Sequence, residues 1–185
     1  DITVERLLPV AAAAARELAS SAPEGLDSRE VGLGYDRRFL APELAEAIAA
    51  AVRGADLEPV LADSPTPTPA SSWAVVQRRA LGALVITASH NPPTYNGIKL
   101  SRAGARGISL ESGLAAIRDR AAEYLEQGIE AVATPGGFRQ AHILAEYANY
   151  LRGLVNLENI RPLKIVVDAG NGMAGMTVPA VLGTA

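Results

Sequence analysis

Residues 84–99, with the sequence LVITASHNPPTYNGIK, join a short apolar run to a polar loop and then to a second short run. The continuous apolar residues 84–86 predict a buried strand. The hydroxyl, imidazole, amide and proline groups that follow predict a sharp loop with Ser89 at its tip, and Gly97 returns the chain into a strand that carries Lys99. A loop held in this way by a buried strand presents a serine oxygen to a ligand.

The sequence around this stretch alternates between helical and extended patterns. Apolar residues at helical spacing predict helices over residues 3–20, from about Pro42 to Val52, from about Pro69 to Ala80, from Ser109 to Leu125, 138–154 and 173–182. Short apolar runs predict strands at 31–35, 57–61, 83–87, 97–101 and 163–167. Strands separated by helices indicate an α/β fold. We therefore predict a three-layer α/β/α domain with a mostly parallel sheet, whose strand at 97–101 is an antiparallel edge strand.

Two of the predicted helices carry specific expectations about burial. In the helix near Pro69, the side chains of Trp73, Val76 and Ala80 are expected to face inward. In the helix that follows, Ser109 is expected to cap the amino terminus. The inner face of that helix is expected to consist of Leu110, Leu114, Ile117, Ala121 and Leu125.

The chain is expected to contain a first domain over residues 1–130, a linker at 131–137 and the beginning of a second domain over 138–185. The linker ends in the sequence TPGG, which is typical of a flexible break. A single strand at 163–167 cannot form a sheet on its own. We therefore expect the second α/β domain to be incomplete within these 185 residues.

Composition and charge exclude several classes of protein. There is no cysteine, so disulfides, thiolate metal sites and cysteine catalysis are excluded. No apolar run approaches the roughly 20 residues of a membrane span, and the first residues lack the features of a signal peptide. We therefore expect no membrane partner and a cytoplasmic location. A net charge of −3 gives no electrostatic reason to expect nucleic acid as a partner.

Several roles are open for Ser89 and its neighbours when the residues are taken alone. Ser89 could be an ordinary turn residue, because serine, asparagine and proline are common in loops. The sequence does not fit the Gly-x-Ser-x-Gly elbow of hydrolases, and the adjacent His90 is poorly placed to act as a base for Ser89. A serine can instead carry a phosphoryl group, whose charge of about −1.5 to −2 favours a divalent metal and cationic donors.

Lys99, His90 and Asn91 have two interpretations each. Lys99 could serve as a point charge or a proton-transfer group beside the serine, or it could be an exposed edge-strand lysine. His90 and Asn91 could orient a substrate or the serine loop, or they could only form the turn. The residue types alone do not separate these alternatives.

A second loop carries a glycine pattern that is associated with dinucleotide binding. Residues 170–175, GNGMAG, satisfy Gly-x-Gly-x-x-Gly between a predicted strand and a predicted helix. No second strand with a ribose-binding acid follows, so a tight turn is the favoured interpretation. Asp168 is expected to support this turn rather than to bind metal.

The pattern Thr-Ala-Ser-His-Asn-Pro-x-x-Tyr-Asn-Gly-x-Lys at residues 87–99 resembles the active-serine signature of the α-D-phosphohexomutase family, which includes phosphoglucomutases and phosphomannomutases. Residues 31–44, with VGLGYDRR followed by PEL, resemble the first strand and helix of that family. The PTPA stretch at 67–70 resembles its Pro-Thr-Pro element, and VVDAGNG at 166–172 resembles the first strand of its second domain. The resemblance spans nearly the whole chain.

This resemblance implies that Ser89 is a phosphoserine that passes its phosphoryl group to a hexose phosphate substrate. A hexose 1,6-bisphosphate intermediate would form, turn over in the site and return its other phosphoryl group to Ser89. The family uses Mg²⁺, which is held by a phosphoserine oxygen and three aspartates, so Ser89 is also the implied metal ligand. Lys99 is implied as the general acid or base, and His90 as part of the catalytic set. Arg38 and Asn91 are implied as contacts to the phosphoserine or the substrate phosphate.

Parts of the family's pattern do not occur in these 185 residues. They include the Gly-Thr-x-Gly-x-Arg-Gly segment, the Asp-Gly-Asp-x-Asp-Arg metal loop, the sugar-selecting loop and the carboxyl-terminal phosphate-binding domain. We therefore interpret the chain as part of a larger enzyme, whose remaining domains would supply the other metal ligands, and we expect the chain alone to be inactive. The alternative is a non-catalytic sugar-phosphate-binding or assembly module built on the same domain.

Overall fold

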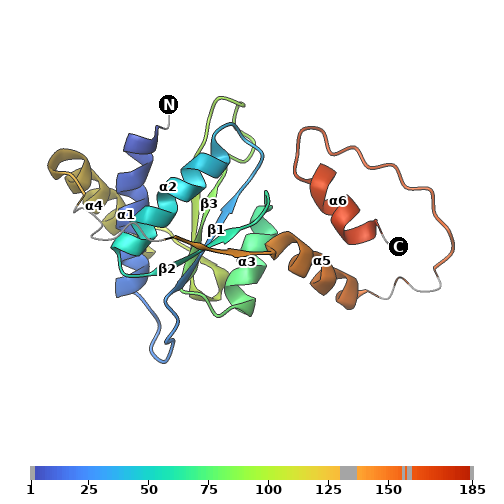
Figure 1. Ribbon diagram of the computed structural model, residues 1–185, viewed down its shortest axis with the longest axis horizontal. Coiled ribbons are helices and arrows are strands. Elements are labelled where there is room, and N and C mark those ends of the chain that lie inside the picture. Colours follow the sequence, from blue (N-terminus) through green and yellow to red (C-terminus); the bar gives the residue numbers. More distant parts are fainter. Residues whose placement is uncertain (1–2, 130–136, 156, 158–159, 184–185) are drawn as a thin grey trace.

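The computed structural model describes residues 3–129, 137–155, 157 and 160–183 (Figure 1). Its sheet has the strand order β5-β4-β3-β1-β2-β6. The strands are β1 (Glu30–Tyr35), β2 (Glu58–Ala62), β3 (Gly82–Ile86), β4 (Ile98–Arg102), β5 (Arg106–Gly107) and β6 (Arg139–Ala141). The helices are α1 (Val4–Ser20), α2 (Ala41–Gly54), α3 (Thr68–Gln77), α4 (Leu114–Gln127), α5 (Ile143–Leu154) and α6 (Ala174–Leu182). No helix in the described part of the chain has the length and hydrophobicity of a membrane span.

Strand β1 occupies the middle of the parallel part of the sheet, with β2 on one side and β3 on the other. Strand β6 continues the parallel part beyond β2. On the other side the sheet ends in antiparallel strands, because β4 pairs with β3 and the two-residue β5 pairs with β4. The predicted α/β fold with a mostly parallel sheet is therefore confirmed, and its antiparallel edge consists of β4 covered by the short β5.

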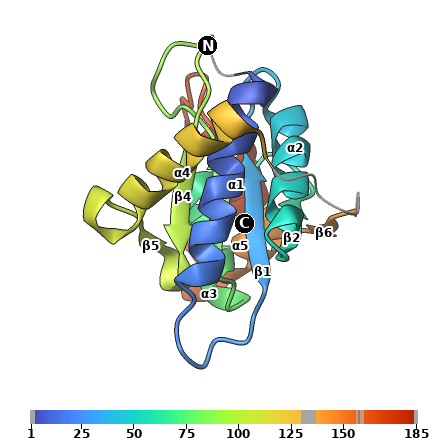
Figure 2. The ribbon, with the colours of Figure 1, turned by 90° about the vertical axis from the view of Figure 1, so that its left-hand side faces the viewer.

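Helices cover both faces of this sheet. On one face, Val31, Leu33 and Tyr35 of β1 pack into a core with α1, α2 and α4, and Figure 2 shows these three helices in front of the sheet. On the other face, α3 and α5 enclose a smaller apolar cluster with β2 and β6. The alternation of side chains along β1 produces this arrangement, because successive residues of a strand point to opposite faces.

Helix α3 packs closely on β1 because residue 34 is a glycine. A Cβ at Gly34 would lie 2.5 Å from the Oγ atom of Ser71, which is buried in the first turns of α3. Next to this contact, the backbone N–H of Thr66 donates a 2.7 Å hydrogen bond to the carbonyl oxygen of Tyr35. The loop that leads into α3 is thus fixed against the carboxyl end of β1.

The expected inner face of α4 is wrong at three positions. Ser109 forms a reciprocal capping box with Ser112 around a 3-10 turn, and α4 begins only after Gly113. Ile117 and Ala121 are buried as predicted. The three leucines that were expected beside them are exposed: Leu110, Leu114 and Leu125. Leu110 belongs to the 3-10 turn, and the other two lie near the ends of α4.

Helix α3 also presents a different face from the one predicted. Its buried residues are Ala70, Ser71, Ala74 and Val75, which lie on one side of the helix. Val76 is 50% exposed, so the expectation that it faces inward is wrong. Trp73 is partly buried against the smaller apolar cluster that α3 and α5 enclose, and Ala80 is buried but lies beyond the end of the helix.

The segment around residues 163–167 is not a strand, so that prediction is wrong. The segment pairs with no strand of the sheet, and Val166 is 87% exposed. A strand requires a neighbour, and the described residues provide none here. The turn after this segment is confirmed, because the backbone N–H of Gly170 donates a 2.9 Å hydrogen bond to the side chain of Asp168.

The predicted helix at 138–154 begins later than expected, because residues 139–141 form β6. The Glu30 carboxylate helps to fix this strand, since it accepts hydrogen bonds from Arg78 and, at 3.0 Å, from Arg139. The bond to Glu30 raises the pKa of Arg78. The linker at 131–137 falls almost entirely outside the described residues, so the division of the chain into domains stays a prediction.

Candidate functional site

The carboxyl ends of β1 and β3 bring two loops together. Tyr35 pairs with Ile86 at the ends of these parallel strands, and the N–H of Asp36 donates a 3.1 Å hydrogen bond to the carbonyl oxygen of Ile86. The loop after β1 contains residues 36–40, and the loop after β3 contains residues 87–97, which we call the serine loop. In α/β sheets of this kind, ligands bind beyond the carboxyl ends of the strands.

The base of the serine loop is closed by backbone hydrogen bonds. The N–H of Thr87 donates a 3.0 Å hydrogen bond to the carbonyl oxygen of Gly97. A Cβ at residue 97 would lie 3.1 Å from the carbonyl oxygen of Thr87, so the glycine permits this close approach. Within the loop, the N–H of Asn91 donates to the carbonyl oxygen of Ala88 at 3.0 Å. The loop is thus a tight, internally bonded turn.

Ser89 has a left-handed backbone conformation at the tip of this loop. Its φ angle is 54°, which is uncommon for a residue other than glycine. The hydroxyl oxygen of Thr87 accepts a 3.0 Å hydrogen bond from the N–H of Ser89 and so stabilises this conformation. The side chain of Ser89 is exposed. A strained conformation that surrounding contacts maintain is typical of functional sites.

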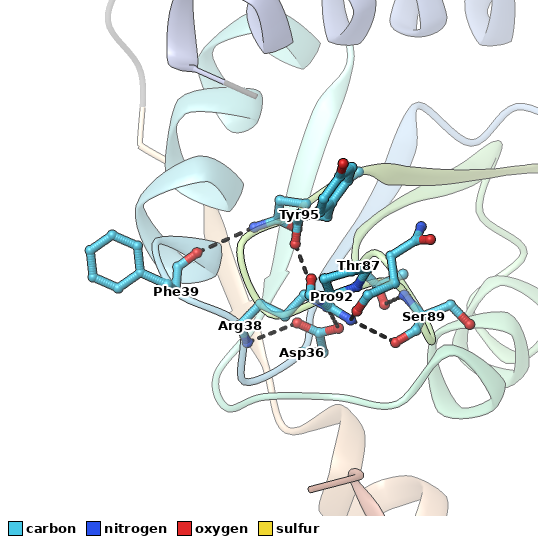
Figure 3. Close-up of polar contacts among 10 residues, drawn as sticks. Asp36, Arg38, Phe39, Thr87, Ser89, Pro92 and Tyr95 are labelled. Carbon is cyan, nitrogen blue, oxygen red and sulfur yellow. Dashed lines mark hydrogen bonds and ion pairs between the residues drawn. The ribbon is translucent and has the colours of Figure 1, made fainter. Parts of the chain in front are cut away.

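The side chain of Arg38 holds the serine loop through backbone carbonyl groups (Figure 3). Its Nη1 atom donates to the carbonyl oxygens of Pro92 at 2.9 Å and Tyr95 at 3.0 Å. Its Nη2 atom donates to the carbonyl oxygens of Ser89 at 2.7 Å and Asn91 at 2.8 Å. One guanidinium therefore joins four carbonyl groups of a single loop.

Asp36 orients this arginine. Its carboxylate accepts a 2.9 Å hydrogen bond from the backbone N–H of Arg38 and lies 3.6 Å from the Nε atom of the same residue. The side chains of Asp36 and Arg38 are only 16% and 14% exposed. A guanidinium has five N–H donors, and in Arg38 four of them bond loop carbonyls while the fifth faces Asp36. The side chain of Arg38 thus contacts the serine loop, and its donors are already committed to protein oxygens.

The two loops line a pocket of about 740 Å³ together with residues 66–68 and 171–173. Its wall includes Lys99, which pairs with Val85 in the β3–β4 ladder. Residues directly opposite each other in such a ladder point to the same face of the sheet. Val85, Thr87 and Lys99 all line the pocket, as do Ser89, His90 and Asn91. The structure therefore brings the predicted site residues to one cavity, and their catalytic roles stay predictions.

Other residues at or beside the pocket received no catalytic or binding role from the sequence. Arg37 lines the pocket beside Arg38, and the turn at 171–173 lines it from the carboxyl-terminal part of the chain. Asn96 joins the two loops, because its Nδ2 atom donates a 3.3 Å hydrogen bond to the carbonyl oxygen of Phe39. Both arginines after β1 line the cavity, whereas the family resemblance implied a role only for Arg38.

The donor set for a metal ion at this site is small. The described residues contain no group of three or more histidine, aspartate or glutamate side chains that could hold a metal ion. At the pocket, Asp36 is engaged by Arg38, which leaves the Ser89 oxygen or a phosphate on it as the candidate ligand. Mg²⁺ requires near-octahedral oxygen coordination. The described part of the chain does not by itself fit a Mg²⁺ site.

Comparisons with known proteins relate this site to a class of enzymes. Residues 1–128 match the family model described as "Phosphoglucomutase/phosphomannomutase, alpha/beta/alpha domain I". A protein of Xanthomonas campestris pv. campestris named "Phosphohexose mutases" is 37% identical over 164 residues, which cover 89% of this chain and 36% of that protein. The phosphomannomutase of Salmonella typhimurium is 36% identical over 158 residues, which cover 85% and 34%.

A solved structure agrees with these matches. The crystal structure of a phosphoglucomutase/phosphomannomutase family protein from Burkholderia thailandensis superposes with a TM-score of 0.77 at 27% identity, and the match covers 97% of this chain and 39% of that one. The resemblance to phosphohexomutases is thereby confirmed. The chain spans about a third of the length of the curated relatives it matches.

Proposed function

The chain belongs to the phosphoglucomutase/phosphomannomutase family, and on this premise we propose that Ser89 is the phosphoryl carrier of a hexose phosphate mutase. The reaction would interconvert the 1-phosphate and the 6-phosphate of a hexose through a bisphosphorylated sugar. The observation that carries this proposal is the position of Ser89, which is exposed at the tip of a braced loop and lines the same pocket as Lys99.

The proposed reaction begins with a phosphoryl group on Oγ of Ser89. A hydroxyl oxygen of the hexose phosphate attacks phosphorus, a new O–P bond forms, and the bond between phosphorus and Oγ breaks. Lys99 is the candidate for proton transfer: its ammonium group would donate a proton to the departing serine oxygen, and the resulting amine would take up the proton of the sugar hydroxyl. The bisphosphate then turns over, Ser89 takes the other phosphoryl group, and the isomerised hexose phosphate leaves.

The chain's own contribution to this chemistry is positioning and charge. Phosphoryl transfer depends mainly on alignment of the reacting groups and neutralisation of their charge. Arg38 and the closed base of the serine loop fix the backbone of Ser89, and Lys99 places a cation on the wall beside it. Together these contacts support a carrier serine more directly than they support an ordinary turn residue.

The remaining parts of the reaction are assigned to a longer protein. The relatives are about three times as long as the matched segment, so we propose that their additional domains correspond to parts that complete this site. These parts would supply the cluster of carboxylates for Mg²⁺, because no such cluster is found among the described residues. The hexose 1,6-bisphosphate would act as the intermediate.

Intact-mass measurement tests the proposal. The full-length enzyme purified from its host should carry one phosphoryl group, peptide mapping should place it on Ser89, and glucose 6-phosphate should remove it. Ser89→Ala should carry none. A protein that binds glucose 6-phosphate, holds no phosphoryl group and transfers none would instead be the non-catalytic sugar-phosphate-binding module, and the mutase proposal would be wrong.

A further inference from the structure

The pocket has two adjacent arginines with different surroundings. Arg38 is largely buried, and its guanidinium donates to four loop carbonyls while facing the Asp36 carboxylate. A phosphate could bind Arg38 only if it displaced one of these oxygens from the loop that holds Ser89. Arg38 is therefore a positioning residue, and it is not available to an incoming anion.

Arg37 is in the opposite situation. It is exposed and lines the pocket. No hydrogen bond or ion pair of its side chain to another described residue is found, so its guanidinium donors are open to a ligand. The backbone on both sides of Arg37 is held in place. The N–H of Asp36 donates to the carbonyl oxygen of Ile86, and the N–H of Arg38 donates to the Asp36 carboxylate. Arg37 thus extends from a fixed segment with its donors unused.

The charges around the pocket strengthen this contrast. Its charged lining residues are Asp36, Arg37, Arg38 and Lys99. The charge of Asp36 is compensated by Arg38, whereas no acidic partner is found for Arg37 or Lys99 in the part of the chain that the structure describes. The cavity therefore carries two uncompensated positive charges and no uncompensated negative charge, which favours an anionic ligand.

We propose that Arg37 binds a phosphate monoester dianion in this pocket. A guanidinium can bind phosphate through two parallel N–H···O bonds, which a lysine cannot reproduce. The monoester could be the phosphate of the sugar or the phosphoryl group on Ser89, since both present the same oxygens. The inference deepens the proposed function and rests on it for the identity of the ligand, but not for the presence of an anion site.

The test compares Arg37→Gln, Arg37→Lys and the control Arg118→Gln in the full-length enzyme. Arg118 is an exposed arginine of α4 that does not line the pocket and pairs with Asp119. The first measurement is the affinity of the dephosphorylated enzyme for glucose 6-phosphate by calorimetry. The second is the rate at which the phosphorylated enzyme loses its phosphoryl group to water without sugar. Thermal unfolding confirms that each variant folds.

For Arg37→Gln we expect the affinity for glucose 6-phosphate to fall by about 10- to 100-fold, the usual range for losing a hydrogen-bonded charge partner. Arg37→Lys should recover part of it, and Arg118→Gln should bind like the unmodified enzyme. A normal affinity combined with at least a tenfold change in phosphoserine hydrolysis would identify the Ser89 phosphoryl group as the ligand instead. If neither quantity changes, the inference is wrong.

The outcomes also separate this inference from the proposed function. An enzyme that shows no phosphoserine and no mutase activity, but loses glucose 6-phosphate binding on Arg37→Gln, would contradict the proposed function and support the anion site. The enzyme could instead be an active mutase that binds glucose 6-phosphate and hydrolyses its phosphoserine equally well with and without the Arg37 guanidinium. That result would support the proposed function and contradict the anion site at Arg37.

Discussion

The Nη2 atom of Arg38 donates a 2.7 Å hydrogen bond to the carbonyl oxygen of Ser89, a residue 51 positions further along the chain. This bond joins the loop after β1 to the loop after β3 at the backbone of the candidate nucleophile. The left-handed backbone of Ser89 has a cost, and the bonds from Arg38 offset it by holding the carbonyl oxygen of Ser89 and three carbonyl oxygens that follow it in the loop. The position of one side chain thus determines where the reactive oxygen lies.

Replacing Arg38 by lysine should separate the effect of its positive charge from the effect of its hydrogen bonds to the serine loop. The ammonium group keeps the charge, but it has three donors on a compact centre and cannot bridge four carbonyls. We expect the free energy of unfolding to fall by about 1–3 kcal/mol, as for the loss of a few hydrogen bonds. Turnover should fall by about 10²-fold, since a displacement of about 1 Å has this effect on a reacting group. Urea denaturation and steady-state kinetics measure the two effects, with Arg118→Lys as control. Wild-type turnover by a folded Arg38→Lys enzyme would contradict the positioning role.

Two substitutions of Ser89 should be equally inactive but differ in stability. Both remove the oxygen that would carry the phosphoryl group. Ser89→Ala should change the free energy of unfolding by no more than about 0.5 kcal/mol, because the side chain is exposed. Ser89→Gly should be more stable than Ser89→Ala by about 1 kcal/mol, because glycine adopts φ near 54° without steric cost. Denaturation curves and a mutase assay check both statements. Residual turnover near the wild-type rate in either variant would show that Ser89 is not the carrier.

Lys99 provides a test of the proton-transfer role. Lys99→Met should lower turnover by about 10²–10⁴-fold, the usual range for general acid–base catalysis. Lys99→Arg should restore only part of the loss, because a guanidinium stays charged and cannot act as a base. Turnover numbers of the two variants at saturating substrate decide the question. Equal rates for Lys99→Met and the unmodified enzyme would leave Lys99 as an ordinary strand residue.

The sequence predicted the sheet well because β1, β2 and β3 each contain a short, largely apolar run. It did not reveal β6, since the residues Arg-Gln-Ala have no apolar alternation and only Ala141 of this strand is buried. The pairing of β6 depends on the neighbouring edge of β2 and on Glu30, which lies 109 positions from Arg139. The opposite error arose at 163–167, where an apolar run suits a strand but has no neighbour to pair with.

The sequence predicted which residues lie at the candidate site better than it predicted what each of them does. The serine loop identified Ser89, His90, Asn91 and Lys99 as neighbours, because one short loop and one ladder contain them all. The difference between Arg37 and Arg38 could not be read from the sequence. It depends on which guanidinium reaches the carbonyl oxygens of a loop that is more than 50 positions away.

The packing of α3 on β1 gives a prediction about stability alone. Gly34→Ala would place a Cβ 2.5 Å from Ser71 Oγ, and overpacking of this kind costs about 1–3 kcal/mol. Ser71→Ala should remove the clash, because the Cβ of Ser71 would lie 3.6 Å from the new methyl group. The hydroxyl of Ser71 is buried without a hydrogen-bond partner among the described residues, so its loss should cost little. Gly32→Ala is the matched control, since its new Cβ would meet Ala83 at an ordinary 3.5 Å.

A double-mutant cycle measures this coupling. The free energies of unfolding of Gly34→Ala, Ser71→Ala and the double variant should be non-additive, with the double variant recovering most of the loss. The free energy of unfolding of Gly32→Ala should stay within about 0.5 kcal/mol of that of the unmodified protein. Additive effects of the two substitutions would show that Ser71 is not the group that requires glycine at residue 34.

The last prediction concerns what these 185 residues can do alone. Mg²⁺ should bind the isolated chain weakly even when Ser89 is phosphorylated, because one phosphate and water do not replace a set of carboxylates and the described residues form no acidic cluster. Transfer from phosphoserine to glucose 6-phosphate should therefore be slow, since charge on the transferring group is not neutralised. The measurement mixes the phosphorylated chain with Mg²⁺ and the sugar and follows the loss of protein-bound phosphate, with the full-length enzyme as the comparison. Rapid sugar-dependent transfer by the chain alone would show that Ser89, Lys99 and the arginines suffice, and that the proposed requirement for further domains is wrong.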